Sequence, residues 1–152
     1  MKIKLYKRPG KKKKLINELN SIISKLTPEW FTIEVGESFY IDLHYQDVFV
    51  LFEKNSIKSF IMFTCIDGFI HITLFATNSE DRNKGYGRIL YNYLEKYCVK
   101  NGFRKFSVMA KSPEVNIKFQ GTIEFYKKLG FKINKIFKEL WENGSVSMEK
   151  II

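Results

Sequence analysis

Residues 69–110 read FIHITLFATNSEDRNKGYGRILYNYLEKYCVKNGFRKFSVMA, and this stretch decides the fold. It opens with an apolar run, Phe69–Ala76, that has the length of a strand. Apolar residues then recur with the helical period from Ile89 to Cys98, and Asn101-Gly102 ends that pattern. Lys105–Ala110 reads as another strand. A strand, a helix and a strand in this order predict two parallel strands joined by a right-handed crossover.

The flanking sequence predicts a sheet and further helices around this crossover. The dipeptide Asp67-Gly68 stands between two apolar runs, which is a strong signal for a two-residue hairpin turn. Pro9-Gly10 ends a first strand, and Thr27-Pro28 stops an amphipathic helix. The other predicted strands cover residues 2–7, 47–53, 57–65, 145–151 and a run from Phe131, and the other predicted helices cover residues 15–26, 36–44 and 118–129.

These elements predict the α/β class, with a mixed, mostly antiparallel sheet that contains one parallel β-α-β crossover. No linker, repeat or low-complexity segment divides the sequence, so we expect a single domain over residues 1–152. A hydrophobic fraction of 45%, with 14 Phe, 8 Tyr and 2 Trp, is enough for a core and excludes a disordered chain.

The sequence also suggests a cytoplasmic protein. No apolar run approaches the roughly 20 residues of a membrane-spanning helix, and no apolar segment follows the charges of Met1-Lys2-Ile3-Lys4, so we expect no membrane partner and no secretory signal. Cys65 and Cys98 show no CxxC spacing, so we expect two reduced, buried thiols and no metal.

The net charge of +10 is concentrated at the N-terminus. Eight of the 26 basic residues and no acidic residue lie in residues 1–14, and the rest of the chain is close to neutral. Such a patch can attract anionic ligands, among them an RNA backbone. The run Lys11–Lys14 has no interleaved aromatic residue, so a solvated turn and helix start is the favoured interpretation, and nucleic acid is not the expected partner.

The loop Arg82-Asn83-Lys84-Gly85-Tyr86-Gly87 stands between a predicted strand and a predicted helix. Glycines there let the backbone turn tightly, and the first N–H groups of the following helix point toward an anion. This arrangement predicts a cradle for a pyrophosphate, to which Arg82, Lys84 and Arg88 add charge. A Walker loop is excluded because Gly-Lys-Ser/Thr is absent, and a Rossmann fingerprint because Leu90 occupies the place of the third glycine.

This loop resembles the acyl-coenzyme A loop of the GNAT superfamily of N-acetyltransferases, Gln/Arg-x-x-Gly-x-Gly/Ala. The segment Ile123–Phe131 (IEFYKKLGF) is similar to the family's late helix-to-strand segment, with one strand and one helix between the two motifs. Residues 28–31 and 137–141 resemble one bacterial branch of the family whose acceptors are mostly unassigned.

The resemblance implies one GNAT domain over the whole chain, with the parallel crossover at the coenzyme site. It implies transfer of an acetyl group from acetyl-CoA, without a metal, to a primary amine of an unidentified small molecule or protein, by direct attack in a ternary complex. Homodimers are common in the family, and no residue here requires one. By position, the implied coenzyme-binding residues are Phe75, Ala76, Thr77, Arg82, Asn83, Lys84, Gly85, Tyr86, Gly87 and Arg88.

Two residues are catalytic candidates. Tyr126 matches the family tyrosine that acts as general acid, and its alternative is a core tyrosine on an amphipathic helix. His71 lies eleven residues before Arg82, where several members carry a glutamate that acts as general base; its alternative is a half-buried strand histidine. His44 has no positional match. Many members carry an asparagine seven residues before the tyrosine, and here that position is Phe119.

The remaining residues are interpreted as structural rather than catalytic. Glu80 and Asp81 read as solvated turn residues, and Trp30 and Trp141 as core or pocket wall. The methionines expected in the core are Met62, Met109 and Met148.

Two other functions remain open at this point. One is a basic nucleic-acid-binding domain that uses Lys11–Lys14, with acetylation of aminoacyl-tRNA as a hybrid of both ideas. The other is a catalytically silent GNAT fold that binds coenzyme A.

Overall fold

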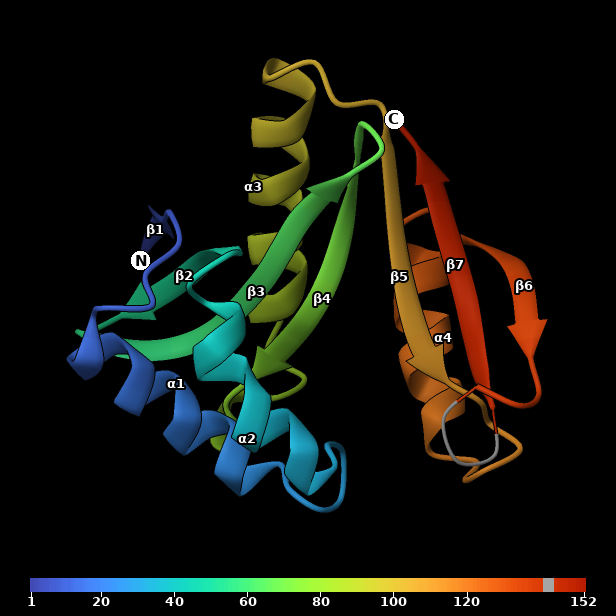
Figure 1. Ribbon diagram of the computed structural model, residues 1–152, viewed down its shortest axis with the longest axis horizontal. Helices are drawn as coiled ribbons and strands as arrows, with labels where there is room; N and C mark the ends of the chain where they lie inside the picture. The colour runs from blue at the N-terminus through green and yellow to red at the C-terminus, as the bar shows by residue number, and fades with distance from the viewer. Residues whose placement is uncertain (141–143) are drawn as a thin grey trace. The chain divides into compact units, whose positions relative to one another are not determined.

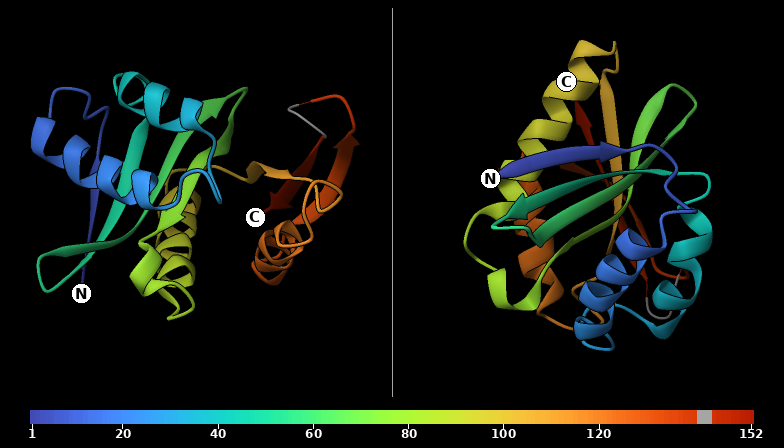
Figure 2. Two further views of the ribbon diagram at one scale, coloured as in Figure 1. Left: turned by 90° about the horizontal axis from the view of Figure 1, so that it is seen from below. Right: turned by 90° about the vertical axis from the view of Figure 1, so that its left-hand side faces the viewer.

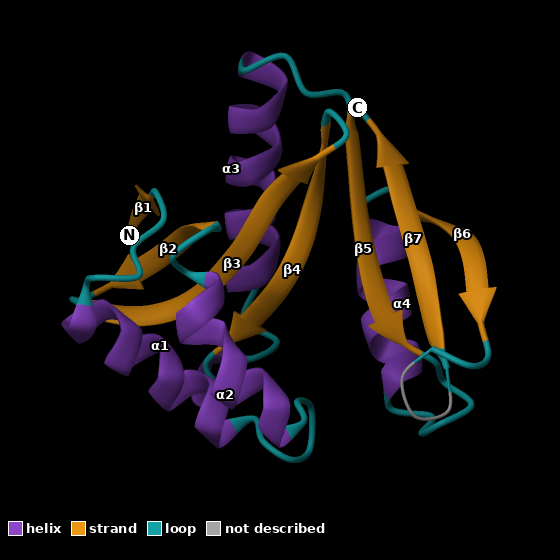
Figure 3. Ribbon diagram, in the orientation of Figure 1, coloured by secondary structure: helices purple, strands orange, loops and turns teal. Residues whose placement is uncertain are grey.

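The computed structural model describes residues 1–140 and 144–152, which contain seven strands and four α-helices (Figures 1 and 3). A short 3-10 turn, Ser79–Asp81, precedes the third helix. The elements in chain order are β1 (Lys2–Tyr6), α1 (Lys13–Lys25), α2 (Ile33–Asp42), β2 (Asp47–Glu53), β3 (Ser56–Ile66), β4 (Phe69–Thr77), α3 (Tyr86–Lys100), β5 (Lys105–Lys111), α4 (Phe119–Lys128), β6 (Lys132–Phe137) and β7 (Ser145–Ile151).

The strands hydrogen-bond in the order β1-β2-β3-β4-β5-β7-β6. Strands β4 and β5 run parallel, with Ile70, His71 and Ile72 opposite Phe106, Ser107 and Val108. The pairs β1–β2, β2–β3, β5–β7 and β6–β7 are antiparallel. The predicted α/β class, with a mixed sheet and one parallel pair, is therefore confirmed.

The first of two compact units comprises residues 1–64 and 74–97. It holds β1, β2, most of β3, the end of β4, α1, α2 and most of α3. Helices α1 and α2 lie on one face of these strands and α3 lies on the other (Figure 2). The α1 pattern predicted from its period is confirmed, because its buried residues are the ones that the period selects: Leu15, Leu19, Ile22 and Ile23.

The second compact unit comprises residues 65–73 and 98–152. It holds the start of β4 together with β5, β6, β7 and α4. Helix α4 buries Phe119, Ile123 and Tyr126. The rings of Tyr126 and Phe131 pack edge to face, with their centroids 5.4 Å apart.

Two tight turns have the backbone that a two-residue hairpin requires. Asp67 and Gly68 both have positive φ, 53° and 81°, which confirms the predicted turn between β3 and β4. Lys54 and Asn55, in the turn between β2 and β3, also have positive φ, 51° and 61°.

Three expectations were wrong in detail. Helix α2 begins at Ile33, three residues earlier than predicted. Cys65 is exposed rather than buried, because the last residues of β3 extend beyond the core; Cys98 is buried, and both thiols are free. Met109 is 37% exposed because it points to the opposite face of β5 from Val108 and Ala110, whereas Met62 and Met148 are buried.

Within the part of the chain that the structure describes, no helix has both the length and the apolar character needed to cross a bilayer.

Candidate functional site

The predicted site residues form two groups, one in each compact unit. The first unit carries the end of β4, Phe75–Thr77, and the loop and helix start from Arg82 to Arg88. The second unit carries His71 on β4 and Tyr126 on α4.

The glycine loop turns just before α3. Asn83 and Gly85 have positive φ, 62° and 87°, so the chain reverses there in a conformation that favours glycine. The N–H of Ile89 donates to the carbonyl oxygen of Gly85 at 3.1 Å. The N–H groups of Tyr86, Gly87 and Arg88 therefore lie in the first helical turn, where no earlier helical carbonyl can accept from them.

The space beside Gly85 is open. A Cβ built on Gly85 meets no atom within 4 Å. A ligand can therefore approach the backbone of the loop closely, and the positive end of the helix dipole favours a negatively charged one.

Asp81 is buried, which the sequence did not predict. Its carboxylate lies 3.3 Å from the Lys58 ammonium and 3.4 Å from the Lys84 ammonium. Its N–H donates to the Asn78 carbonyl at 2.8 Å, and the Asn78 N–H donates to the Lys58 carbonyl at 2.9 Å. The interpretation as a solvated turn residue is wrong for Asp81, because the 3-10 turn directs its side chain toward β3.

Glu80, the neighbour of Asp81, behaves as predicted. Its side chain is 77% exposed, and its carboxylate lies 3.6 Å from the Lys25 ammonium. Adjacent acids in one turn thus have opposite environments.

The charges of the loop are partly engaged within the protein. The guanidinium of Arg82 lies over the Trp30 ring, 4.0 Å from its centroid, and Lys84 pairs with Asp81. Trp30 is partly buried and packs against the core of the first unit, as expected for a wall residue. Trp141 lies outside the described residues.

Tyr86 ties the start of α3 to the end of β2. Its hydroxyl donates a hydrogen bond to the Glu53 carboxylate, and this bond raises the pKa of Tyr86 above its ordinary value. Sequence reasoning missed Glu53 and Lys58, since neither belongs to a motif and each reaches the loop from a distant strand.

At the end of β4, the carbonyl oxygen of Ala76 already accepts a hydrogen bond. The hydroxyl of Ser59 donates to the Ala76 carbonyl at 2.9 Å and lies 3.0 Å from the Thr77 hydroxyl. Beyond it, the side-chain oxygen Oδ1 of Asn78 is buried and accepts no hydrogen bond from the residues that the structure describes. A buried acceptor of this kind is unfavourable unless a donor arrives.

His71 is held by the neighbouring parallel strand. Its Nδ1 forms a hydrogen bond with the Ser107 hydroxyl, and its ring centroid lies 4.6 Å from that of Phe69. Burial lowers the pKa of His71, and Lys105 acts in the same direction, while Asp67 and Glu149 oppose them. The neutral imidazole, which can accept a proton, is therefore favoured.

Tyr126 lies in an aromatic environment and is 5% exposed. Its ring packs edge to face on Phe125 and Phe131, each with a centroid separation of 5.4 Å. Burial raises the pKa of Tyr126 above its ordinary value of about 10, so the phenol keeps its proton at neutral pH.

Phe119 is buried. It occupies the position at which many members of the family that this motif resembles carry asparagine. The ammonium groups of Lys111 and Lys118 lie over its ring, 5.2 Å and 5.3 Å from the centroid. The aromatic face thus holds two cations that a carboxamide would not hold in this way.

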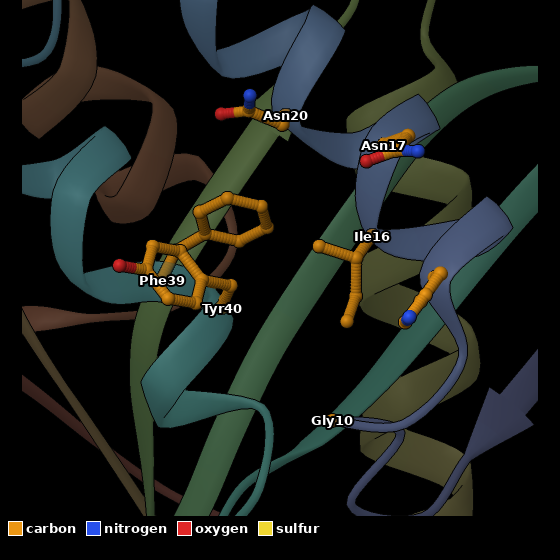
Figure 4. A pocket seen from close by; sticks show the side chains of 7 residues that line it. Gly10, Ile16, Asn17, Asn20, Phe39 and Tyr40 are labelled. Atoms are coloured by element: carbon orange, nitrogen blue, oxygen red, sulfur yellow. The ribbon is translucent and has the colours of Figure 1, made fainter.

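A separate pocket of about 370 Å³ lies against α1 and α2 in the first unit (Figure 4). Its polar groups are the amides of Asn17 and Asn20, the Tyr40 hydroxyl and the Lys13 ammonium. It therefore offers binding contacts rather than a carboxylate or imidazole base. The lining is completed by Gly10, Ile16 and Phe39.

The sequence model of the Acetyltransferase (GNAT) family matches residues 16–131. This match contains the glycine loop, His71 and Tyr126. No curated protein matches the chain.

Many solved structures share this fold, and the three described here are each less than 20% identical to this chain in sequence. An aminoglycoside 6′-N-acetyltransferase complexed with coenzyme A matches with a TM-score of 0.76 and 18% identity, over 99% of this chain and 97% of that one. The aminoglycoside 6′-N-acetyltransferase from Enterococcus faecium gives 0.76 and 19%, over 99% and 97%. The ribosomal-protein-S18-alanine N-acetyltransferase from Escherichia coli gives 0.76 and 14%, over 99% and 94%.

We expect Asp81→Asn to lower the free energy of unfolding by roughly 1–3 kcal/mol, because it removes the buried negative charge that two ammonium groups share. Glu80→Gln should change it by less than about 0.5 kcal/mol, because that ion pair is exposed. Urea unfolding of the two variants and the parent protein measures both values. Equal losses in the two variants would contradict the assignment of Asp81 as the residue that holds the turn.

Proposed function

Since the chain belongs to the acetyltransferase (GNAT) family, we propose that it transfers an acetyl group from acetyl-coenzyme A to a primary amine of a small molecule or protein. The transfer occurs by direct attack of the amine in a ternary complex. The names of the solved relatives support an amine as acceptor, because each of them denotes an N-acetyltransferase.

The backbone turn at Gly85 is the observation that carries this proposal. It combines a positive φ, open space in front of the glycine, and three N–H groups in the first turn of α3. These features fit a pyrophosphate, which needs several converging donors and close approach of the backbone.

The end of β4 fits the rest of coenzyme A. By their position at the end of β4, on either side of Ala76, the main-chain groups of Phe75 and Thr77 are assigned to the pantetheine arm and to the thioester carbonyl. A main-chain N–H donated there stabilises the negative charge that develops on the carbonyl oxygen during attack.

The bound thioester supplies an activated acetyl group. The amine nitrogen forms a bond to the acetyl carbon, the carbon–sulfur bond breaks, and the sulfur leaves with the bonding electron pair. Tyr126 is assigned as the donor of a proton to that sulfur. Its support is that the buried phenol carries its proton at neutral pH and can therefore donate it.

His71 is assigned as the group that takes the proton from the attacking amine, directly or through water. Its support is a pKa that burial lowers, so the ring is neutral at pH 7. The Ser107 hydroxyl fixes Nδ1 and leaves Nε2 as the nitrogen for proton transfer.

Gly85→Ala should weaken binding of coenzyme A on the order of tenfold, because alanine resists the positive φ and turns the loop amides away from the ligand. Gly102→Ala is the matched control. Gly102 has nearly the same φ, 88°, and equally open surroundings, so both variants carry about 1–2 kcal/mol of backbone strain. Calorimetry measures the affinity of each variant for coenzyme A, and only Gly85→Ala should show the loss. Absence of coenzyme A binding by the parent protein would refute the proposed function.

Tyr126→Phe should lower kcat by about 100-fold or more while the affinity for acetyl-CoA stays close to that of the parent, because only the proton donor is lost. Tyr45→Phe, at a tyrosine that is 77% exposed, should leave both unchanged. Release of free thiol, corrected for hydrolysis, is measured across a panel of primary amines. Coenzyme A binding without acetyl transfer to any amine would indicate a catalytically silent fold.

The pH dependence tests His71. Because burial lowers its pKa, kcat/KM should fall on an acidic limb whose midpoint lies below the ordinary imidazole value of about 6.5. His71→Gln should remove this limb, since glutamine cannot take up the proton. His44→Gln, at the other histidine of the chain, should retain it. An unchanged acidic limb in His71→Gln excludes His71 as the base.

A further inference from the structure

A second, strongly basic hollow lies in the first unit. Its volume is about 770 Å³, and residues of β1, the end of β2, the turn after β2 and the start of α1 line it. None of these residues belongs to the glycine loop or to the end of β4. The lining comprises Lys2, Lys4, Tyr6, Lys12, Lys13, Lys14, Leu15, Glu18, Phe52 and Asn55.

The charge of this hollow is almost entirely of one sign. Five lysines face one acid, Glu18. Within residues 1–140 and 144–152, none of these five lysines forms an ion pair. Five lysines with a single acid among them repel one another, and a bound polyanion reduces that repulsion.

The fold places two aromatic rings among the lysines. Lys2, Lys4 and Tyr6 alternate along β1 and therefore share one face, and Phe52 stands directly opposite Lys2 on β2. The Lys4 ammonium lies 5.9 Å from the centroid of the Tyr6 ring. The sequence run Lys11–Lys14 contains no aromatic residue, so this combination arises only when β1, β2 and α1 are brought together.

We propose that this hollow binds a single-stranded nucleic acid, with its phosphates on the lysines and a base against Tyr6 and Phe52. Positive grooves with aromatic side chains are the usual means of binding single strands without sequence preference. A peptide of acidic residues alone would supply charge but no planar group to stack on the two partly buried rings. This site is independent of the coenzyme loop and goes beyond acetyl transfer.

The test is the fluorescence anisotropy of a labelled oligouridine of about 12 nucleotides with the full chain, between about 50 and 200 mM salt. The triple variant Lys2→Gln, Lys4→Gln and Lys13→Gln should lose affinity by about tenfold or more. It should also reduce the slope of log affinity against log salt by about 2, since each lost phosphate contact removes about 0.7.

The control triple variant Lys96→Gln, Lys100→Gln and Lys128→Gln removes the same charge from exposed lysines on α3 and α4 that have no ion pair among the described residues, and it should bind like the parent. Tyr6→Leu should weaken binding several-fold with an unchanged salt slope, because it removes stacking and not charge. Thermal melting confirms that each variant is folded, and Phe52→Leu replaces Tyr6→Leu if the latter is not.

Four results would overturn the proposal. They are no binding by the parent at the lowest salt, equal losses in the two triple variants, equal affinity for a duplex of the same length, and equal competition by polyglutamate at the same concentration of charge. The last result would point to an acidic protein as the partner. Binding that persists in Gly85→Ala supports a site separate from the coenzyme loop.

Discussion

The buried carboxylate of Asp81 is the interaction on which the candidate coenzyme loop depends. It joins an ammonium from β3 and one from the loop itself, while the backbone of the same turn is hydrogen-bonded to β3. A loop rich in glycine has many accessible conformations, and its amides converge only if its start is fixed. The carboxylate provides that fixed point, and the Tyr86–Glu53 hydrogen bond provides a second at the start of α3.

Burial acts on the two catalytic candidates in opposite directions with one result. It raises the pKa of Tyr126 and lowers that of His71, because a low dielectric disfavours the charged form of each group. Tyr126 is neutral at pH 7, as an ordinary tyrosine is, and the neutral form of His71 is favoured. These protonation states are the ones that the proposed roles of Tyr126 as acid and His71 as base require.

Local sequence patterns predict most of the fold. The helical period of α1 and α3, the Asp67-Gly68 turn and the strand-glycine-helix order are properties of neighbouring residues, so they could be read in sequence. The environment of Asp81 could not, because its partner Lys58 lies 23 positions away. The same limit applies to Met109 and Cys65, whose exposure depends on which face and which end of a strand the core covers. The basic hollow likewise required the pairing of β1 with β2.

The Arg82–Trp30 contact links the glycine loop to the segment that precedes α2. A cation over an aromatic face stabilises a structure by about 0.5–2 kcal/mol. An anion that draws Arg82 away from the ring must therefore interact with the guanidinium by more than this free energy. If an anion bound Arg82 and a second molecule displaced the indole, each would change the affinity of the protein for the other by the same factor. The stacked pair of Arg82 and Trp30 would then couple the two binding events.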